Sequence, residues 1–127
     1  MEFSLSSEQE MIIDSVRSFV EQELYPHEDE VEKTNHIDAS LAESIKQKAI
    51  ELGLYATNMP TEYGGGGLDT LTLCLVEKEL GKANFGLQYI VARPSNILMA
   101  CKDEQIEKYL LPTIRGCLLY TSDAADE

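Results

Sequence analysis

The chain has few basic residues and no long apolar run. Among its 127 residues, 10 are Lys or Arg and 23 are Asp or Glu, which gives a formal net charge of −13. Nucleic acids and anionic membrane surfaces are bound through clustered Lys and Arg, so neither is expected as a partner. No apolar run approaches the roughly 18 residues that a membrane-spanning helix requires. The sequence therefore predicts no membrane insertion.

Cysteine is scarce as well. The three cysteines, Cys74, Cys101 and Cys117, form no Cys-x-x-Cys pair, and an odd number suits a reduced protein better than a disulfide scaffold. The first residues, "MEFSLSSEQE", lack the basic and apolar regions of a secretory signal. We therefore expect a cytoplasmic protein. Cys74 and Cys101 lie in the apolar runs "LTLCLV" and "ILMACK", which predicts buried, inert thiols rather than nucleophiles.

The chain does contain apolar residues at helical spacing. They make up 43% of the sequence, enough for the core of a single domain. No segment alternates as a strand would. Two clear apolar stripes instead recur every three or four residues: Ile12, Val16, Phe19 and Val20 in the first, and Leu41, Ile45, Ala49 and Leu52 in the second. The predicted fold class is all-α, a bundle of about five or six helices.

Capping and turn residues set the expected limits of these helices. Helix starts are predicted at the capping boxes Ser7–Glu10 and Ser40–Glu43, and at the N-cap residues Asp69, Asn84 and Asp103. Helix ends are predicted near Pro26, Gly53, Gly81 and Pro112. The charged stretch "HEDEVEKTNHID" is expected to form a solvated turn of helix or a connector.

Most local patterns in the sequence favour structural roles. The four glycines from Gly64 to Gly67 lack the Gly-Lys-Ser/Thr of a phosphate loop, so a turn between helices is expected. His27 and His36 lie among acids without zinc or calcium spacing, so no metal ligand is predicted. An acidic metal buffer over residues 27–38 is the weaker alternative. No "GxSxG" elbow is present, and no catalytic residue is predicted.

Gln88 is a candidate binding residue, because it lies in the otherwise apolar stretch "FGLQYIVA" with Tyr89 beside it and Ala92 one turn further along. It could be the polar point in the wall of an apolar pocket, or simply an exposed position. The residues alone leave both interpretations open. Without a catalytic cluster, the chain reads as a helical domain that binds something or belongs to something larger.

Four stretches, taken in order, carry a family resemblance: "FSLSSEQEMIIDSVRSFV", "LGLYATNMPTEYGGGGLD", "EKELGKAN" and "DEQIEKYLLPTIRG". Together they resemble the N-terminal helical domain of flavin-dependent acyl-CoA dehydrogenases, over residues 2–116. The resemblance implies an FAD enzyme that oxidises the α and β carbons of an acyl-CoA, with a base taking a proton and the flavin a hydride. It also implies electron-transferring flavoprotein as the electron acceptor and a homotetramer as the assembly.

The resemblance also says which parts of such an enzyme this chain holds. The flavin contacts and the catalytic glutamate come chiefly from the middle and C-terminal domains, so the resemblance places no catalytic and no cofactor-binding residue in this chain. The helix after "E-L-G" partly walls the acyl cavity in the family. Gln88, Tyr89 and Ala92 are therefore the expected substrate-binding residues. The fragment alone is expected to be inactive.

The last residues, "CLLYTSDAADE" (117–127), depart from the family pattern. Back-translated, they resemble the transposase mosaic end and adapter used in DNA sequencing libraries, so we expect them not to be native. A natural short terminus is the alternative. If it holds, the rival interpretation of the chain is a standalone helical protein–protein interaction module, which binds a partner through its apolar face.

Overall fold

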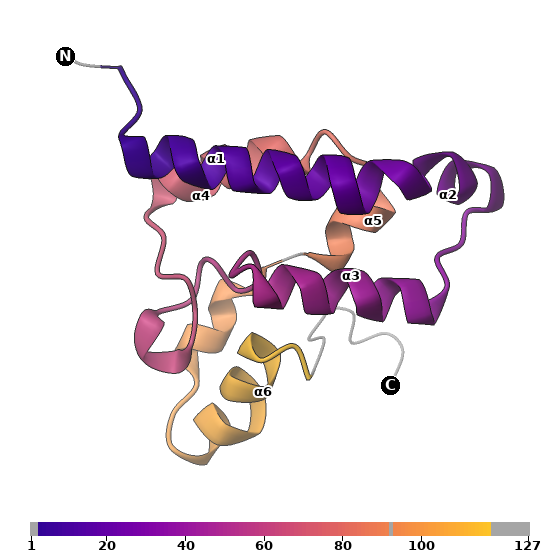
Figure 1. The fold of residues 1–127 in the computed structure, drawn as a ribbon. Helices are drawn as coiled ribbons and strands as arrows, with labels where there is room; N and C mark the ends of the chain where they lie inside the picture. Colours follow the sequence, from indigo (N-terminus) through magenta and orange to yellow (C-terminus); the bar gives the residue numbers. More distant parts are fainter. Residues whose placement is uncertain (1–2, 92, 118–127) are drawn as a thin grey trace.

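A computed structural model describes residues 3–91 and 93–117, and within these residues every regular element is helical. Figure 1 shows α1 and α2 in one long rod above α3, with α4 behind α1. Helix α5 runs down from this layer toward α3, and α6 lies below α3. The all-α prediction is confirmed. The α-helices are α1 (Ser7–Phe19), α2 (Glu28–Thr34), α3 (Ala39–Glu51), α4 (Thr70–Leu80), α5 (Phe85–Ile90) and α6 (Leu111–Ile114).

Helix α1 begins one residue earlier than the sequence predicted. Its N-cap is Ser6, whose hydroxyl accepts from the N–H of Gln9 while the Gln9 amide oxygen accepts from the N–H of Ser6. Ser7 with Glu10 has the same spacing, so the sequence alone does not distinguish the two frames. The Gln9 amide also donates to the hydroxyl of Thr72 on α4, which favours the observed frame.

The first helix was predicted to end around Leu24 or Tyr25, before Pro26; a π-helical segment does end at Leu24, but the helical rod does not. The rod continues through a π-helical segment (Val20–Leu24) and a 3-10 turn (Tyr25–His27) directly into α2. Pro26 stands in the first turn of this new hydrogen-bonding frame, where its missing N–H needs no partner. The N–H of Tyr25 donates back to the carbonyl of Val20 and closes the π turn. The charged stretch therefore contains a helix, with Val31 buried on its inner face.

Helix α3 begins at Ala39, so the predicted capping box of Ser40 and Glu43 is wrong. The Glu43 carboxylate instead pairs within the helix with Lys46 and accepts from Gln47. The predicted end is confirmed: Gly53 has a φ of +71°, and the N–H of Leu54 donates to the carbonyl of Ala49. This left-handed cap turns Leu54 back into the core.

The starts of α4 and α5 are confirmed. The Asp69 carboxylate accepts from the N–H of Thr72, and the Asn84 amide oxygen accepts from the N–H groups of Gly86 and Leu87. Gly81 follows the last residue of α4, as expected.

In the last helical region the predicted cap and the predicted end are wrong. Helical structure does begin directly after Asp103, at Glu104, but Asp103 has a φ of +50°, outside the extended range of an N-cap. The π-helical segment Ile106–Leu110 follows. Pro112 does not end the helix but lies in the first turn of α6, after the N–H of Leu111 has bonded to the carbonyl of Ile106. The chain thus passes Pro26 and Pro112 in the same way, with a π turn before each.

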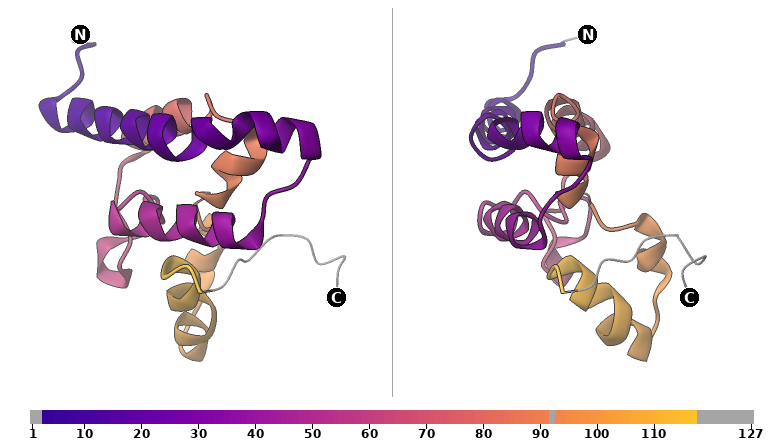
Figure 2. Two further views of the ribbon diagram at one scale, coloured as in Figure 1. Left: turned by 45° about the vertical axis from the view of Figure 1, so that its right-hand side comes forward. Right: turned by 90° about the vertical axis from the view of Figure 1, so that its right-hand side faces the viewer.

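Two hydrophobic clusters hold the helices together. The larger joins α1 through α5 and contains Val16, Phe19, Leu24, Ile45 and Leu87, among others. The smaller joins residues 55–59 to the last helical region. Figure 2 shows that region to one side of the α1–α3 layer. None of the described helices is long and apolar enough to cross a membrane.

The predicted burial of the thiols is wrong for Cys74. Cys74 is exposed and Cys101 is half-buried. The buried face of α4 carries Thr72, Val76 and Glu79, so Cys74 stands on the opposite side of the helix despite its apolar neighbours.

Candidate functional site

Gln88 and Tyr89 line one cavity of about 260 Å³ beside α5. Both come from the same short helix, with Gln88 half-buried and Tyr89 44% exposed. Ala92, the third predicted pocket residue, lies outside the described residues. The structure thus brings two of the three predicted residues to one cavity. The full lining is Glu77, Leu80, Phe85, Gln88, Tyr89, Val91 and Arg93.

Helix α5 is fixed at its start and by one buried side chain. Asn84 caps its first turn, while the N–H of Asn84 donates to the Glu28 carboxylate of α2 at 2.7 Å. The Asn84 amide also donates to the carboxylate of Glu32. Leu87 is fully buried in the larger cluster. Because Leu87 occupies the inward face, Gln88 and Tyr89 turn toward the cavity.

The floor of the cavity is apolar and its rim is charged. Leu80 and Val91 are buried below it. At the rim the Arg93 Nε lies 3.0 Å from the Glu77 carboxylate, and both side chains are about half-exposed. An exposed ion pair of this kind contributes little to stability, about 0–1 kcal/mol. Its effect here is to place charge at one edge of an otherwise apolar hollow.

Aromatic rings form one wall. The ring centroids of Phe85 and Tyr89 are 6.0 Å apart with a 34° angle between the planes. Phe85 is 74% exposed. Phe85 was not among the predicted site residues. Its spacing of four residues from Tyr89 was the available signal, since such residues share one helix face.

The glycine run is not a phosphate cradle. The N–H groups of Gly64, Gly65, Gly66 and Gly67 all donate to backbone carbonyls of residues 56–61. A Cβ on Gly65 would lie 2.2 Å from the Met59 carbonyl oxygen, so the loop needs glycine for close packing. The predicted turn between helices is the structure observed. These four N–H groups are therefore not free to hold a phosphate group.

The acidic stretch does not gather into a metal site. Among the described residues, no group of three His, Cys, Asp or Glu side chains is placed to hold an ion. His36 lies 3.3 Å from the Asp38 carboxylate, and both are exposed.

Glu79 is the one charged side chain buried among the described residues, and it was not among the predicted site residues. It accepts from Arg17 of α1 and from Lys82, whose Nζ lies at 2.7 Å. Hydrogen bonds from Arg17 and then Lys82 hold the pKa of this carboxyl below its ordinary range. Its position three residues after Val76, on the buried stripe, was the signal. Since both cations that contact Glu79 are protein side chains, this residue joins α1 to α4 and is not available as a general base.

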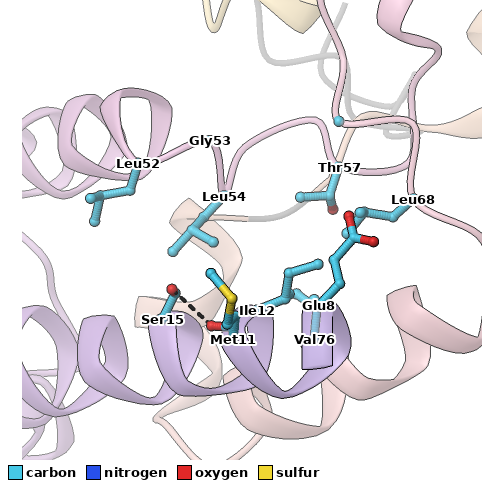
Figure 3. Close-up of a pocket in the computed structure, with 11 residues that line it drawn as sticks. Glu8, Met11, Ile12, Ser15, Leu52, Gly53, Leu54, Thr57, Leu68 and Val76 are labelled. Atoms are coloured by element: carbon cyan, nitrogen blue, oxygen red, sulfur yellow. Dashed lines mark hydrogen bonds between the residues drawn. The ribbon is translucent and has the colours of Figure 1, made fainter. Parts of the chain in front are cut away.

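A second cavity, also of about 260 Å³, lies between α1, the end of α3 and the glycine loop. Figure 3 shows Met11 and Ile12 of α1 facing Leu54 across it. The Ser15 hydroxyl is already used, since it donates to the carbonyl of Met11 at 2.9 Å. This groove is mainly apolar and contains none of the predicted site residues.

Known proteins match the chain along almost its whole length. The model of the "Acyl-CoA dehydrogenase, N-terminal domain" family matches residues 6–117. The chain belongs to the acyl-CoA dehydrogenase family. Curated relatives include a 3-(aryl)acrylate reductase of Clostridium sporogenes, 34% identical over 87% of this chain and 30% of the relative. A probable acyl-CoA dehydrogenase, YngJ, of Bacillus subtilis is 34% identical over 94% of this chain and 32% of the relative.

A solved structure agrees with the fold. Its chain, described under "Electron transferring flavoprotein of Acidaminococcus fermentans: Towards a mechanism of flavin-based electron bifurcation", matches with a TM-score of 0.73 and 33% identity. The match covers 92% of this chain and 31% of that chain. The chain thus spans about a third of the length of these three relatives.

Proposed function

We propose that this chain is the N-terminal helical part of an FAD-dependent enzyme that oxidises the α and β carbons of an acyl-CoA thioester. The observation that carries the proposal is the α5 cavity, which is lined by both Gln88 and Tyr89, two of the residues proposed for the acyl wall. The family membership of residues 6–117 supports it. In this proposal residues 2–116 are the domain, and they supply part of the acyl pocket but neither the base nor the flavin site.

FAD, acyl-CoA and electron-transferring flavoprotein belong to the full-length protein in this proposal. A flavin supplies the hydride acceptor of the oxidation when it is bound. We further propose a homotetramer and a cytoplasmic location for the full-length enzyme, both from the family resemblance.

The test is the activity of the full-length protein encoded by the source gene. We expect it to carry flavin and to oxidise an acyl-CoA with a dye as electron acceptor, whereas the 127-residue chain does neither. Some relatives are named reductases, so the reverse assay uses an enoyl-CoA with a reduced dye. A full-length protein that carries no flavin and acts in neither direction contradicts the proposal.

A standalone interaction module is the second candidate, and exposed apolar side chains favour it. Phe85, Ile97 and Met11 are each at least 70% exposed, so these apolar side chains are available to a partner. It predicts that the chain binds a separate protein without any downstream sequence. The first candidate predicts instead that the rest of the same enzyme covers these side chains.

Residues 117–127 are proposed to be the translation of a library adapter. The family model ends at residue 117, and residues 118–127 lie outside the described residues. The check is to sequence the source DNA across the codons of Arg115 to Glu127 from a library prepared without transposase. A reading frame that continues past Gly116 into a flavin-binding stretch supports the proposal. The codons of "CLLYTSDAADE" followed by a stop contradict it.

A further inference from the structure

The α5 cavity has a shape and a lining that favour one class of acyl group. Its volume of about 260 Å³ exceeds the roughly 150 Å³ of an apolar cavity that holds benzene. A ring with a short linker therefore fits, while a long alkyl chain would have to leave the hollow. The Glu77–Arg93 ion pair stands at one edge, where an alkyl chain that grows past the hollow would meet charged side chains.

The aromatic wall adds a geometric preference. Phe85 and Tyr89 stand one turn apart on α5 and hold their rings 6.0 Å apart in a tilted arrangement. Aromatic pairs favour offset or edge-to-face contact at centroid distances of about 4.5–7 Å, so a third ring can pack against this pair with the same geometry. An alkyl chain is also buried against this wall, but it does not gain the additional stabilisation of a ring–ring contact.

Two polar groups of the cavity, the Gln88 amide and the Tyr89 hydroxyl, are free to act on a ligand. No side-chain hydrogen bond joins the Gln88 amide or the Tyr89 hydroxyl to another described residue. Gln88 is half-buried beside the apolar floor of Leu80 and Val91. An amide N–H directed at a ring face, or at a ring hydroxyl, would be satisfied by an aromatic ligand and left unpaired by a saturated chain.

We propose that this cavity binds the ring of an aryl-substituted short acyl thioester, such as a 3-arylpropanoyl-CoA, and that Phe85 and Tyr89 set this specificity. The inference rests on the proposed function, because it assigns the acyl group of the same reaction. It assigns no new chemical step: the α and β carbons lie between the thioester and the ring.

The experiment compares two substrates on the full-length enzyme, 3-phenylpropanoyl-CoA and butanoyl-CoA, with a dye as electron acceptor. The enoyl-CoA counterparts, cinnamoyl-CoA and crotonyl-CoA, are compared with a reduced dye. The measured quantity is the ratio of kcat/KM for the aryl substrate to kcat/KM for the alkyl substrate. We expect this ratio to exceed one.

Three variants test the role of the rings. Phe85→Leu and Tyr89→Leu remove one ring each and keep apolar volume, so we expect each to lower the ratio by roughly 2- to 10-fold. Tyr89→Phe keeps the ring and should leave the ratio within about twofold of the wild type. Phe3→Leu removes a ring that is 86% exposed and is absent from the cavity lining, so it is the matched control.

The outcomes separate the inference from the proposed function. A kcat/KM ratio below one overturns the aryl specificity and leaves the acyl-CoA activity standing. The same holds if Phe85→Leu and Tyr89→Leu lower the ratio no more than Phe3→Leu does. Failure to turn over any of the four thioesters overturns the proposed function and the inference with it.

Discussion

The guanidinium of Arg17 on α1 holds the carboxylate of Glu79 on α4 through two hydrogen bonds, Nη2 to Oε1 at 3.0 Å and Nε to Oε2 at 3.4 Å. Glu79 is 4% exposed, while the Arg17 side chain is about half-exposed. This bidentate contact fixes the two helices that pack most extensively on each other. Since α5 follows α4 directly, the same contact supports the helix that carries the candidate pocket.

Replacing Glu79 by Gln should destabilise the chain by about 1–3 kcal/mol, because charge-assisted hydrogen bonds to Arg17 and Lys82 are weakened in a buried place. Urea unfolding followed by circular dichroism measures the change. Asp14→Asn is the matched control, since Asp14 meets Arg17 at 3.7 Å on the surface and is 77% exposed. We expect the control to cost about 0.5 kcal/mol or less. Equal effects of the two substitutions would contradict a structural role for Glu79.

Stability should fall in acid, in part through the same residue. The folded chain holds the pKa of Glu79 below its ordinary value of 4.5, first through Arg17, so the unfolded chain binds the proton more readily. The contribution of Glu79 is therefore complete above the ordinary pKa and is lost as the pH falls through the lower, folded value. The difference in unfolding free energy between wild type and Glu79→Gln should shrink between about pH 7 and about pH 3. A difference that stays constant over this range would show that the carboxylate charge is not what stabilises the contact.

The pattern of right and wrong expectations follows from how local each signal is. Asp69 and Asn84 were found because an N-cap needs only its own side chain and the next backbone N–H groups. Ser6 and Ser7 have the same capping-box spacing. The contact that favours Ser6 joins Gln9 to Thr72, 63 residues away, so the local sequence does not reveal it. Pro26 and Pro112 misled for a related reason, since a π turn before each shifts the hydrogen-bonding frame.

The candidate site shows the same limit. The family resemblance pointed to Gln88 and Tyr89, and the structure places both at one cavity. Glu77 and Arg93 were not predicted as lining because their approach depends on how the chain turns after α5. Burial of Cys74 was wrongly predicted from its apolar neighbours, because helix phase decides which side of α4 faces the core.

The glycine loop provides a test of close packing. Gly65→Ala should destabilise the chain by about 3 kcal/mol, because the new Cβ would lie 2.2 Å from the carbonyl oxygen of Met59 and the backbone must move. Gly53→Ala is the matched control: its Cβ meets nothing within 4 Å, so only the left-handed φ of +71° is strained, at about 1–2 kcal/mol. Thermal or urea unfolding distinguishes the two. A smaller cost for Gly65→Ala than for Gly53→Ala would contradict the packing explanation.

Asn84 links the acidic helix α2 to the start of α5. Asn84→Ala should cost about 1–2 kcal/mol, since it removes the cap of α5 and the contact with Glu32. Asn84→Ser keeps a capping oxygen and should cost less than half as much. If the serine variant is as unstable as the alanine variant, the contact with Glu32, and not the cap, carries the stability.

The chain alone should present more apolar surface than the full-length enzyme. Phe85, Ile97 and Leu71 are each more than half exposed here, and in the proposed enzyme downstream domains cover such side chains. An apolar fluorescent dye should therefore give a larger signal per mole with the 127-residue chain than with the full-length protein. Equal signals would favour the standalone interaction module.

The most direct measurement is an anaerobic titration of the full-length protein with an acyl-CoA, followed by the visible absorbance of bound flavin. If the chain is the N-terminal part of an acyl-CoA dehydrogenase, the oxidised flavin absorbance falls as the thioester is added and an enoyl-CoA accumulates. For an enzyme that works mainly as a reductase, the reduced flavin is reoxidised by an enoyl-CoA instead. A protein with no flavin absorbance, or one whose flavin responds to neither thioester, would contradict the account.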